Sequence, residues 1–267
     1  MAAVRAFFSN KSMNSNIDAV FVGGLRALPP EGQLTGMFKT RVAGPVAVGH
    51  EGLQGDVQAD RRVHGGPEKA VHYYPAEHYA RLAERVPALA GLLLPGVLGE
   101  NLSGFGLSEE TVCIGDVFAI GGCRLQVSQP RQPCWKISHR LGHAPMSRLI
   151  ADLGCTGWYF RVLQAGEIEA GDTVECVERP APGLSLARLW AVKEAHRPDP
   201  AELECLAAAP GLNPDWAARL RARAVWLATQ GAALNLQKLV MAQDTGGAIV
   251  GAVRADLFTG WGVWTDP

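Results

Sequence analysis

A single cysteine lies at the centre of a basic, proline-containing segment, SQPRQPCWKISHR, at residues 128–140. Cys134 follows a proline directly, and arginine, lysine and histidine residues surround it. Nearby positive charge lowers the pKa of a thiol and favours the thiolate, the form that binds metals and attacks electrophiles. Between Asp116 and Asp152 the chain has no carboxylate. The segment therefore predicts an anion site with a preformed thiolate, although a basic run can also be a solvated surface.

A second segment, ADRRVHGGPEKAVHYYP at residues 59–75, carries paired glycines beside basic residues. Gly65 and Gly66 let successive backbone amides turn toward an anion and form a nest. Lys69 adds a positive charge to the same loop. The alternative is a tight turn before a strand, with incidental basic residues.

A third segment, LGENLSGFGL at residues 98–107, places Glu100 and Asn101 between glycines. Their side chains offer hydrogen-bond acceptors and donors on a loop. A turn that the Asn101 side chain stabilises explains the same residues without a binding role.

The sequence lacks the motifs that mark several other classes of functional site. The sequence contains no GxxxxGK[ST], GxSxG or HExxH motif, and its six cysteines form no CxxC pair. Phosphate-loop, hydrolase-elbow, zincin and structural zinc sites are therefore not indicated. A cysteine hydrolase would need a histidine that an acid orients against Cys134. His139 is near, but its segment has no carboxylate to orient it.

Composition and charge limit the partners. The net charge of −1 gives no electrostatic case for nucleic acid or for an anionic membrane surface. The longest apolar runs contain Pro and Gly and are too short to span a bilayer. The first residues do not read as a secretory signal. We therefore expect a cytoplasmic protein with no nucleic-acid or membrane partner.

Strand signals dominate the first two thirds of the chain. Short segments rich in valine and bounded by Gly or Pro are typical of strands, and strands at this spacing favour a closed or partly closed barrel. The Gly121-Gly122 step predicts a hairpin turn. The predicted strands lie in residues 17–25, 42–48, 111–128 and 158–177, the last two ranges holding a pair each.

Helical periodicity appears in two places. Apolar residues at three- and four-residue steps predict a helix over residues 75–90, with Pro75 at its start. After a linker at residues 179–183, a module of three short helices is predicted. Those helices are expected at residues 184–195, 200–209 and 214–229.

Three of these segments, in this order, resemble the YiiM-type branch of the MOSC proteins, named for the C-terminal domain of molybdenum cofactor sulfurases. The matching stretches are DRRVHGGPEKAVHYYPAEHY (60–79), GENLSGFGL (99–107) and VSQPRQPCWKI (127–137). The resemblance covers roughly residues 15–228 and implies a mainly β fold with helices, in which a small three-helix module follows a MOSC-type β-barrel. The predicted domains are the barrel with its N-terminal strands at 1–178, the helical module at 184–230 and an atypical tail at 231–267.

The resemblance also implies chemistry. MOSC proteins of this branch bind a molybdenum cofactor and reduce N-hydroxylated substrates, such as hydroxylaminopurine base analogues and amidoxime-like compounds, to amines. Cys134 would be the catalytic residue and the thiolate ligand to molybdenum. One soft ligand suffices where the dithiolene of the cofactor supplies the others.

The two glycine-containing loops would line the cofactor pocket. Arg131 and Lys136 are expected, from their charge, to contact its terminal phosphate. The loop residues implied are His64, Gly65, Gly66, Lys69, Gly99, Glu100, Asn101 and Leu102.

Electrons would come from a separate flavoprotein or iron–sulfur donor, because no flavin or nicotinamide fingerprint is visible. The pyridoxal phosphate lysine of the sulfurases belongs to a separate domain without a counterpart here. A homodimer is compatible with the sequence. The alternative function is a carrier of molybdenum cofactor or sulfur without turnover, which needs the same thiolate and anion pocket.

Residues 236–257 resemble a different family, the 3D domain of membrane-bound lytic transglycosylase A. The signature is QDTGGAI-x-G followed by Asp256, the positional match of an acid catalyst in that family, with Asp244 as its companion. The rest of that enzyme has no counterpart here. We therefore expect a remnant without glycan activity; a segment that pairs with the barrel or with a second subunit is the alternative.

Overall fold

The computed structural model describes residues 15–30 and 32–231. These residues form two compact units. The first comprises residues 15–191 and 209–213, and the second comprises residues 192–208 and 214–231.

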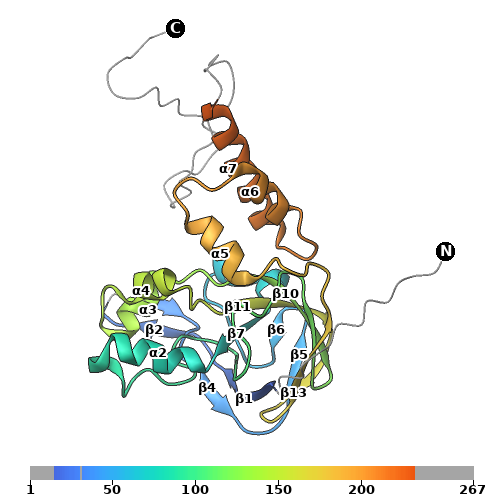
Figure 1. The fold of residues 1–267 in the computed structure, drawn as a ribbon. Coiled ribbons are helices and arrows are strands. Elements are labelled where there is room, and N and C mark those ends of the chain that lie inside the picture. Colours follow the sequence, from blue (N-terminus) through green and yellow to red (C-terminus); the bar gives the residue numbers. More distant parts are fainter. Residues whose placement is uncertain (1–14, 31, 232–267) are drawn as a thin grey trace, which may run out of the picture. The chain divides into compact units, whose positions relative to one another are not determined.

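The first unit is built on a closed β-barrel (Figure 1). β1 (Ser15–Val22) pairs with β8 on one side and with β13 on the other, and this closes a ring of seven strands. Neighbouring strands are antiparallel except β7 and β8, which are parallel. β4 (Thr40–Val42) also pairs with β1. In ring order, the other strands are β13 (Thr173–Glu178), β9 (Val117–Ile120), β10 (Cys123–Pro130), β11 (Trp158–Gln164), β7 (Val71–Pro75) and β8 (Leu102–Gly104).

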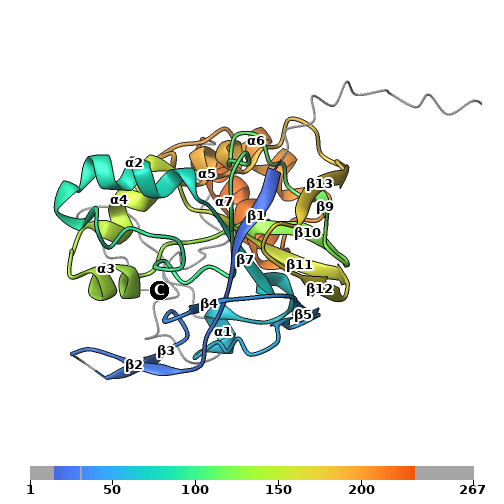
Figure 2. The same ribbon diagram turned by 90° about the horizontal axis from the view of Figure 1, so that it is seen from below.

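Two smaller sheets flank the barrel strands. One has the order β12–β5–β6, and the other is the hairpin of β2 and β3, seen in Figure 2. Their bounds are β12 (Gly166–Ile168), β5 (Val46–Gly49), β6 (Gly52–Leu53), β2 (Arg26–Leu28) and β3 (Gln33–Thr35).

Aromatic side chains fill the barrel. Alternate residues along a strand point to opposite faces, so the buried positions of β10 and β11 face inward together. Tyr73 stacks on Trp158 with ring centroids 4.6 Å apart, and Phe118 meets Phe160 edge-on at 5.8 Å. Offset and edge-on pairs are the favoured aromatic arrangements.

Helices α2, α3 and α4 lie together on one side of the barrel (Figures 1 and 2). They bury a second apolar cluster that includes Tyr79, Leu82, Ile137 and Ile150. Gly142 and Gly154 end α3 and α4 at positive φ, 61° and 65°, a conformation that glycine adopts without steric cost. The helices of this region are α1 (Arg61–His64), η1 (Pro67–Lys69), α2 (Glu77–Arg85), η2 (Pro87–Leu89), α3 (Trp135–Leu141) and α4 (Met146–Leu153).

Three helices follow the barrel in sequence: α5 (Leu186–Glu194), α6 (Pro200–Ala207) and α7 (Pro214–Gly231). In the second unit α6 packs on α7. Asp199 caps α6 by accepting a 2.9 Å hydrogen bond from the amide of Ala201. The Arg223 guanidinium donates to the carbonyl oxygen of Lys193 at 2.6 Å.

The predicted fold class is confirmed, with local corrections. Pro75 ends β7, and the helix begins two residues later. The segment 42–48 is not one strand, because Gly44, at a φ of 80°, and Pro45 separate β4 from β5. All three helices after the linker are present, while the domain boundaries stay a prediction.

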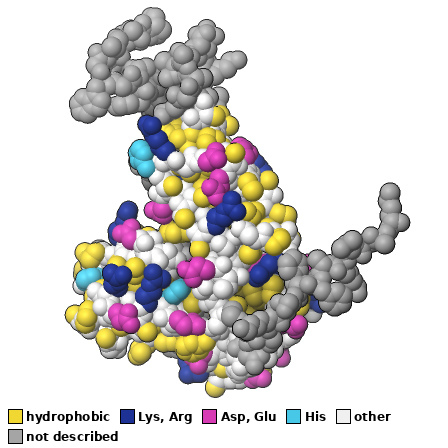
Figure 3. All heavy atoms as spheres, viewed as in Figure 1, with side chains coloured by type: hydrophobic (Ala, Val, Ile, Leu, Met, Phe, Trp, Pro, Cys, Tyr) yellow, Lys and Arg dark blue, Asp and Glu magenta, His cyan; other side chains and the backbone are white. Residues whose placement is uncertain are grey.

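The surface is mixed in charge on the face drawn in Figure 3, where basic and acidic side chains are interspersed. Within the described ranges, no helix combines the length and apolar character needed to cross a membrane.

Candidate active site

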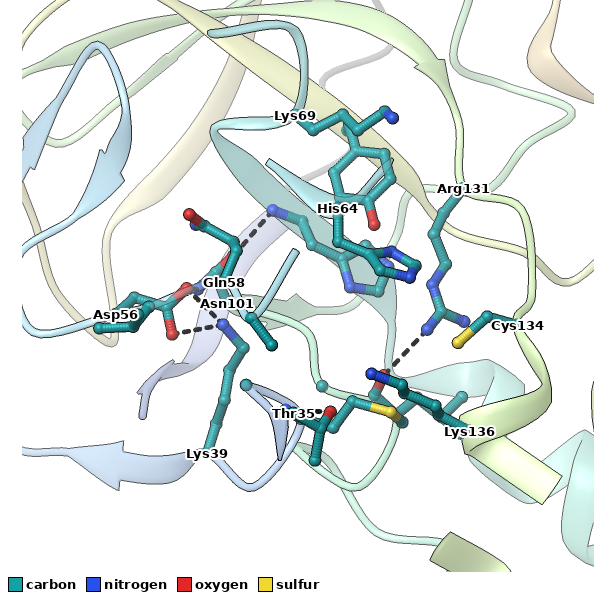
Figure 4. A pocket seen from close by; sticks show the side chains of 18 residues that line it. Thr35, Lys39, Asp56, Gln58, His64, Lys69, Asn101, Arg131, Cys134 and Lys136 are labelled. Carbon is teal, nitrogen blue, oxygen red and sulfur yellow. Dashed lines mark hydrogen bonds and ion pairs between the residues drawn. The ribbon is translucent and has the colours of Figure 1, made fainter. Parts of the chain in front are cut away.

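One pocket of the first unit collects most of the chemistry-bearing residues that the sequence singles out (Figure 4). Its lining includes residues between β10 and α3 and residues of the segments that follow β3 and β6. The predicted residues in its lining are Cys134, His64, Lys69, Gly99, Asn101, Arg131 and Lys136.

Cys134 is the residue before α3, held between a strand and a helix. Its extended backbone (φ −107°, ψ 159°) caps the helix, and its carbonyl oxygen accepts a 3.1 Å hydrogen bond from the amide of Ile137. The thiol is partly buried and points into the pocket beside the Arg131 side chain (Figure 4). A partly exposed thiol beside cations is typical of a reactive or metal-binding cysteine, whereas buried cysteines are usually inert.

Arg131 is 5% exposed and anchors the pocket. Its amide donates to the carbonyl oxygen of Gly157 at 3.0 Å, which extends the pairing of β10 with β11 by one residue. Its Nη2 donates to the carbonyl oxygen of Leu98 at 3.3 Å, but its Nη1 is buried with no hydrogen-bond partner among the residues that the structure describes. Burying such a donor unpaired costs free energy, so this atom is suited to a ligand acceptor.

His64, Lys69 and Lys136 add to the positive character of the pocket. Burial, together with the charges of Arg131, Lys136 and Lys69, lowers the pKa of His64 to about 4. The imidazole is therefore neutral near pH 7. The Lys136 ammonium donates to the carbonyl oxygen of Leu34 at 3.0 Å.

Asn101 lines the pocket and forms hydrogen bonds with three other segments of the chain. Its Oδ1 accepts from the amide of His72 at 3.0 Å, and its Nδ2 donates to an Asp56 carboxylate oxygen at 2.9 Å. Its Nδ2 also donates to the carbonyl oxygen of Phe21 at 3.3 Å. With three protein partners, the Asn101 side chain holds neighbouring segments of the pocket in place.

Four of the residues expected in the pocket lie outside its lining. Gly66, at a φ of 86°, leads into η1, and the Lys69 amide donates back to its carbonyl oxygen at 2.9 Å. Glu100 is buried elsewhere: the Tyr79 hydroxyl and the Gly96 amide both donate to its Oε1 at 2.5 Å. Gly65 and Leu102 also lie outside the lining.

Sequence reasoning missed Lys39 and Asp56, which line the pocket opposite Cys134 in the view of Figure 4. They form a buried ion pair, with side chains 6% and 1% exposed. Burial lowers the pKa of Lys39, and the adjacent carboxylate opposes that shift. Only the fold brings together residues from these two separate segments, so no local motif could reveal the pair.

The donor set fits a molybdenum cofactor. Across the described ranges, no group of three or more His, Cys, Asp or Glu side chains is placed to hold a metal ion. The pocket instead offers one soft thiol, several cations and the unpartnered guanidinium nitrogen of Arg131. That set matches an anionic cofactor that brings its own sulfur ligands and needs one more from the protein.

Comparison with known proteins decides the family. The MOSC domain matches residues 60–175. The YiiM protein of Escherichia coli (strain K12) is 35% identical over 205 residues, which cover 76% of this chain and 90% of the relative. The chain belongs to the MOSC domain family, in its YiiM branch. MOSC domains are associated with molybdenum cofactor binding.

Two further comparisons extend the MOSC assignment. The crystal structure of YiiM from Geobacillus stearothermophilus has a TM-score of 0.66 and 34% identity, covering 79% of this chain and 99% of that one. A protein of Gibberella moniliformis named "Reductase" is 37% identical over 166 residues, which cover 61% of this MOSC chain and 29% of that protein.

A second family also matches this MOSC protein. The 3D domain matches residues 222–264, in agreement with the resemblance seen in the tail. Asp244 and Asp256 lie outside the described residues, so the expected loss of glycan activity stays a prediction.

Proposed function

We propose that this MOSC protein is a molybdenum-cofactor-dependent reductase that converts N-hydroxylated compounds to amines. The observation that carries the proposal is the joint presence, in one pocket, of the Cys134 thiol and of the Arg131 Nη1, a buried donor without a hydrogen-bond partner in the described part of the chain. Family membership and the relative named "Reductase" support an oxidoreductase.

The reaction is a two-electron reduction that cleaves an N–O bond. One N-hydroxylated molecule, R–NH–OH, takes up two electrons and two protons and gives R–NH₂ and water. When bound, the cofactor supplies the metal at which this chemistry takes place. The electrons come from a separate flavoprotein or iron–sulfur protein.

The residues of the chain hold the cofactor and set its surroundings. Cys134 provides the thiolate ligand to molybdenum. Arg131, Lys69 and Lys136 supply positive charge for the anionic groups of the cofactor, and guanidinium is well matched to phosphate oxygens. The low pKa of His64 keeps a neutral imidazole in the pocket, so it offers one donor and one acceptor.

Turnover by the purified protein tests this proposal. The protein is produced in a host that makes molybdenum cofactor and is mixed with 6-N-hydroxylaminopurine and a chemical electron donor such as reduced methyl viologen. Adenine formation is then followed by chromatography. We expect adenine from the parent and none above the uncatalysed background from Cys134→Ser.

If the protein is instead a carrier of molybdenum cofactor or sulfur, the same sample should form no amine product. If the protein holds molybdenum but yields no adenine and no amine from amidoximes, the reductase assignment is wrong. The protein would then be a carrier of cofactor or sulfur. Protein from a host that cannot make the cofactor is the control for donor-driven background reduction.

A further inference from the structure

The buried ion pair of Lys39 and Asp56 lies in the wall of the pocket that also holds Cys134 (Figure 4). Taking two charges out of water costs free energy, and their mutual attraction repays that cost only in part. A buried ion pair is therefore weak evidence for a role in stability. A role in the chemistry of the pocket would explain why the pair is placed there.

Asp56 is held in position by separate segments of the chain. Its Oδ1 accepts the Gly23 amide at 3.1 Å, and its Oδ2 accepts Asn101 Nδ2 at 2.9 Å. Both carboxylate oxygens also accept hydrogen bonds from the Lys39 ammonium. These four bonds fill the acceptor sites of a carboxylate, so Asp56 orients the ammonium and has no site left for a ligand.

Lys39, in contrast, keeps a donor for a ligand. An ammonium group has three N–H donors, and a single carboxylate contacts it from one side only. Among the described residues, Asp56 supplies the only hydrogen-bond acceptors of this ammonium. Because the Lys39 side chain lines the pocket, at least one N–H is available to a molecule bound there.

Several neighbouring groups of the pocket are poorly suited to give up a proton near pH 7. The Arg131 guanidinium does not deprotonate in proteins. Burial lowers the pKa of His64 to about 4, and burial lowers the pKa of His72, which also lines the pocket, well below its ordinary value. Both imidazoles are therefore already neutral. The Lys136 ammonium donates its hydrogen bond to the carbonyl oxygen of Leu34.

The burial of Lys39 favours proton release. Burial disfavours the charged form and lowers the pKa of this lysine, although the Asp56 carboxylate opposes the shift. An acid works best when its pKa lies near the operating pH, so a buried ammonium is a better proton donor than a lysine in water.

We propose that Lys39 is a catalytic residue that donates a proton to the departing hydroxyl group, and that Asp56 is the positioning residue that orients it. The inference rests on the proposed reductase function and deepens it. As the N–O bond breaks, its electron pair leaves with the oxygen, and the Lys39 proton turns the departing hydroxide into water. The nitrogen receives two electrons from the reduced cofactor and one proton from solvent, which gives the amine. The neutral Lys39 then takes a proton back from solvent.

Substitution by arginine separates charge from proton transfer. Lys39→Arg keeps a cation beside Asp56 but removes the transferable proton, whereas Lys39→Ala leaves a space that a small amine can enter. Lys193→Arg is the matched control, because Lys193 pairs with Glu194 outside the pocket lining. Molybdenum content, calorimetric binding of 6-N-hydroxylaminopurine and kcat are measured for each protein. The kcat of Lys39→Ala is also measured with ethylammonium and with guanidinium.

We expect Lys39→Arg to hold as much molybdenum as the parent and to bind the purine as tightly, but to lose about a hundredfold in kcat, the scale of one general acid. Ethylammonium should restore turnover to Lys39→Ala. Guanidinium, which carries the same charge but does not release a proton at neutral pH, should not. Lys193→Arg should behave as the parent does.

Three results would overturn the inference. A kcat like that of the parent in Lys39→Arg, or equal rescue of Lys39→Ala by both cations, would show that Lys39 supplies only charge. Loss of molybdenum from Lys39→Arg would show that Lys39 holds the cofactor or the fold. In each of these cases an active parent leaves the reductase function intact. If the parent itself forms no adenine, the reductase function is wrong, and the proton-donor role is wrong with it.

Discussion

The hydroxyl of Ser147 donates a 2.6 Å hydrogen bond to the carbonyl oxygen of Cys134. The same hydroxyl lies 2.9 Å from the Ser138 hydroxyl, which in turn accepts the Ser147 amide at 3.0 Å. The first turn of α4 is thereby joined to the start and middle of α3. The backbone of the proposed metal ligand is thus fixed from two helices.

Ser147→Ala should loosen Cys134 without unfolding the protein. Losing one hydrogen bond of this kind costs about 1 kcal/mol. We expect a fall of a few degrees in Tm and a severalfold weaker retention of molybdenum during dialysis against a chelator. Ser108→Ala, in an exposed turn, is the control and should retain the metal as the parent does. Equal retention by Ser147→Ala and the parent would show that this bond does not position Cys134.

Asp116 and Arg179 form an ion pair that stabilises the barrel. The carboxylate is fully buried, accepts Arg179 Nη2 at 2.7 Å and Nε at 3.0 Å, and also accepts the Cys113 amide at 2.9 Å. Arg179→Met leaves a buried acceptor short of partners, at a cost of about 1–3 kcal/mol. Urea denaturation measures this loss.

Arg148→Met is the matched control for that experiment. Arg148 pairs with Asp152 at 2.7 Å, but it is 74% exposed. Exposed pairs contribute at most about 1 kcal/mol. If the two variants lose the same free energy of unfolding, the buried pair has no special role.

Glu100 should make stability depend on pH. Burial raises its pKa, and its Oε2 has no hydrogen-bond partner within residues 15–30 and 32–231. In the unfolded chain this carboxyl loses its proton near its ordinary value of 4.5, while the folded protein retains the proton to a higher pH. The folded state therefore binds more protons, and the contribution of Glu100 to the unfolding free energy falls as pH rises above that value.

Glu100→Gln removes this titration. We expect the unfolding free energy of the variant, relative to the parent, to increase between about pH 5 and about pH 7. Urea denaturation across that range measures it, with the exposed Glu110→Gln as control. A constant difference between Glu100→Gln and the parent would contradict the raised pKa.

Local signals in the sequence were sufficient for many of the elements. The Gly121-Gly122 step predicted the turn between β9 and β10, and Gly121 has the positive φ of 53° that such a turn requires. The helices α3 and α4 were missed, because their basic and proline-rich surroundings read as a loop. Gly142 and Gly154, which end them, were the available signal.

The site was predictable only in part. Cys134 and Arg131 share one short segment whose composition indicates an anion pocket. Lys39 and Asp56 lie far from that segment in sequence, and neither has a motif around it. Their pairing depends on the register of β1, β4 and β8 around the barrel, which no local pattern specifies.

Molybdenum content is the most direct test of the central claim, that Cys134 binds the metal of the cofactor. The parent, Cys134→Ala and Cys205→Ala, which removes an exposed cysteine, are purified from a host that makes the cofactor. Metal analysis should give about one molybdenum per chain for the parent and for Cys205→Ala, and almost none for Cys134→Ala. Equal molybdenum in Cys134→Ala and the parent, or none in the parent, would contradict the assignment.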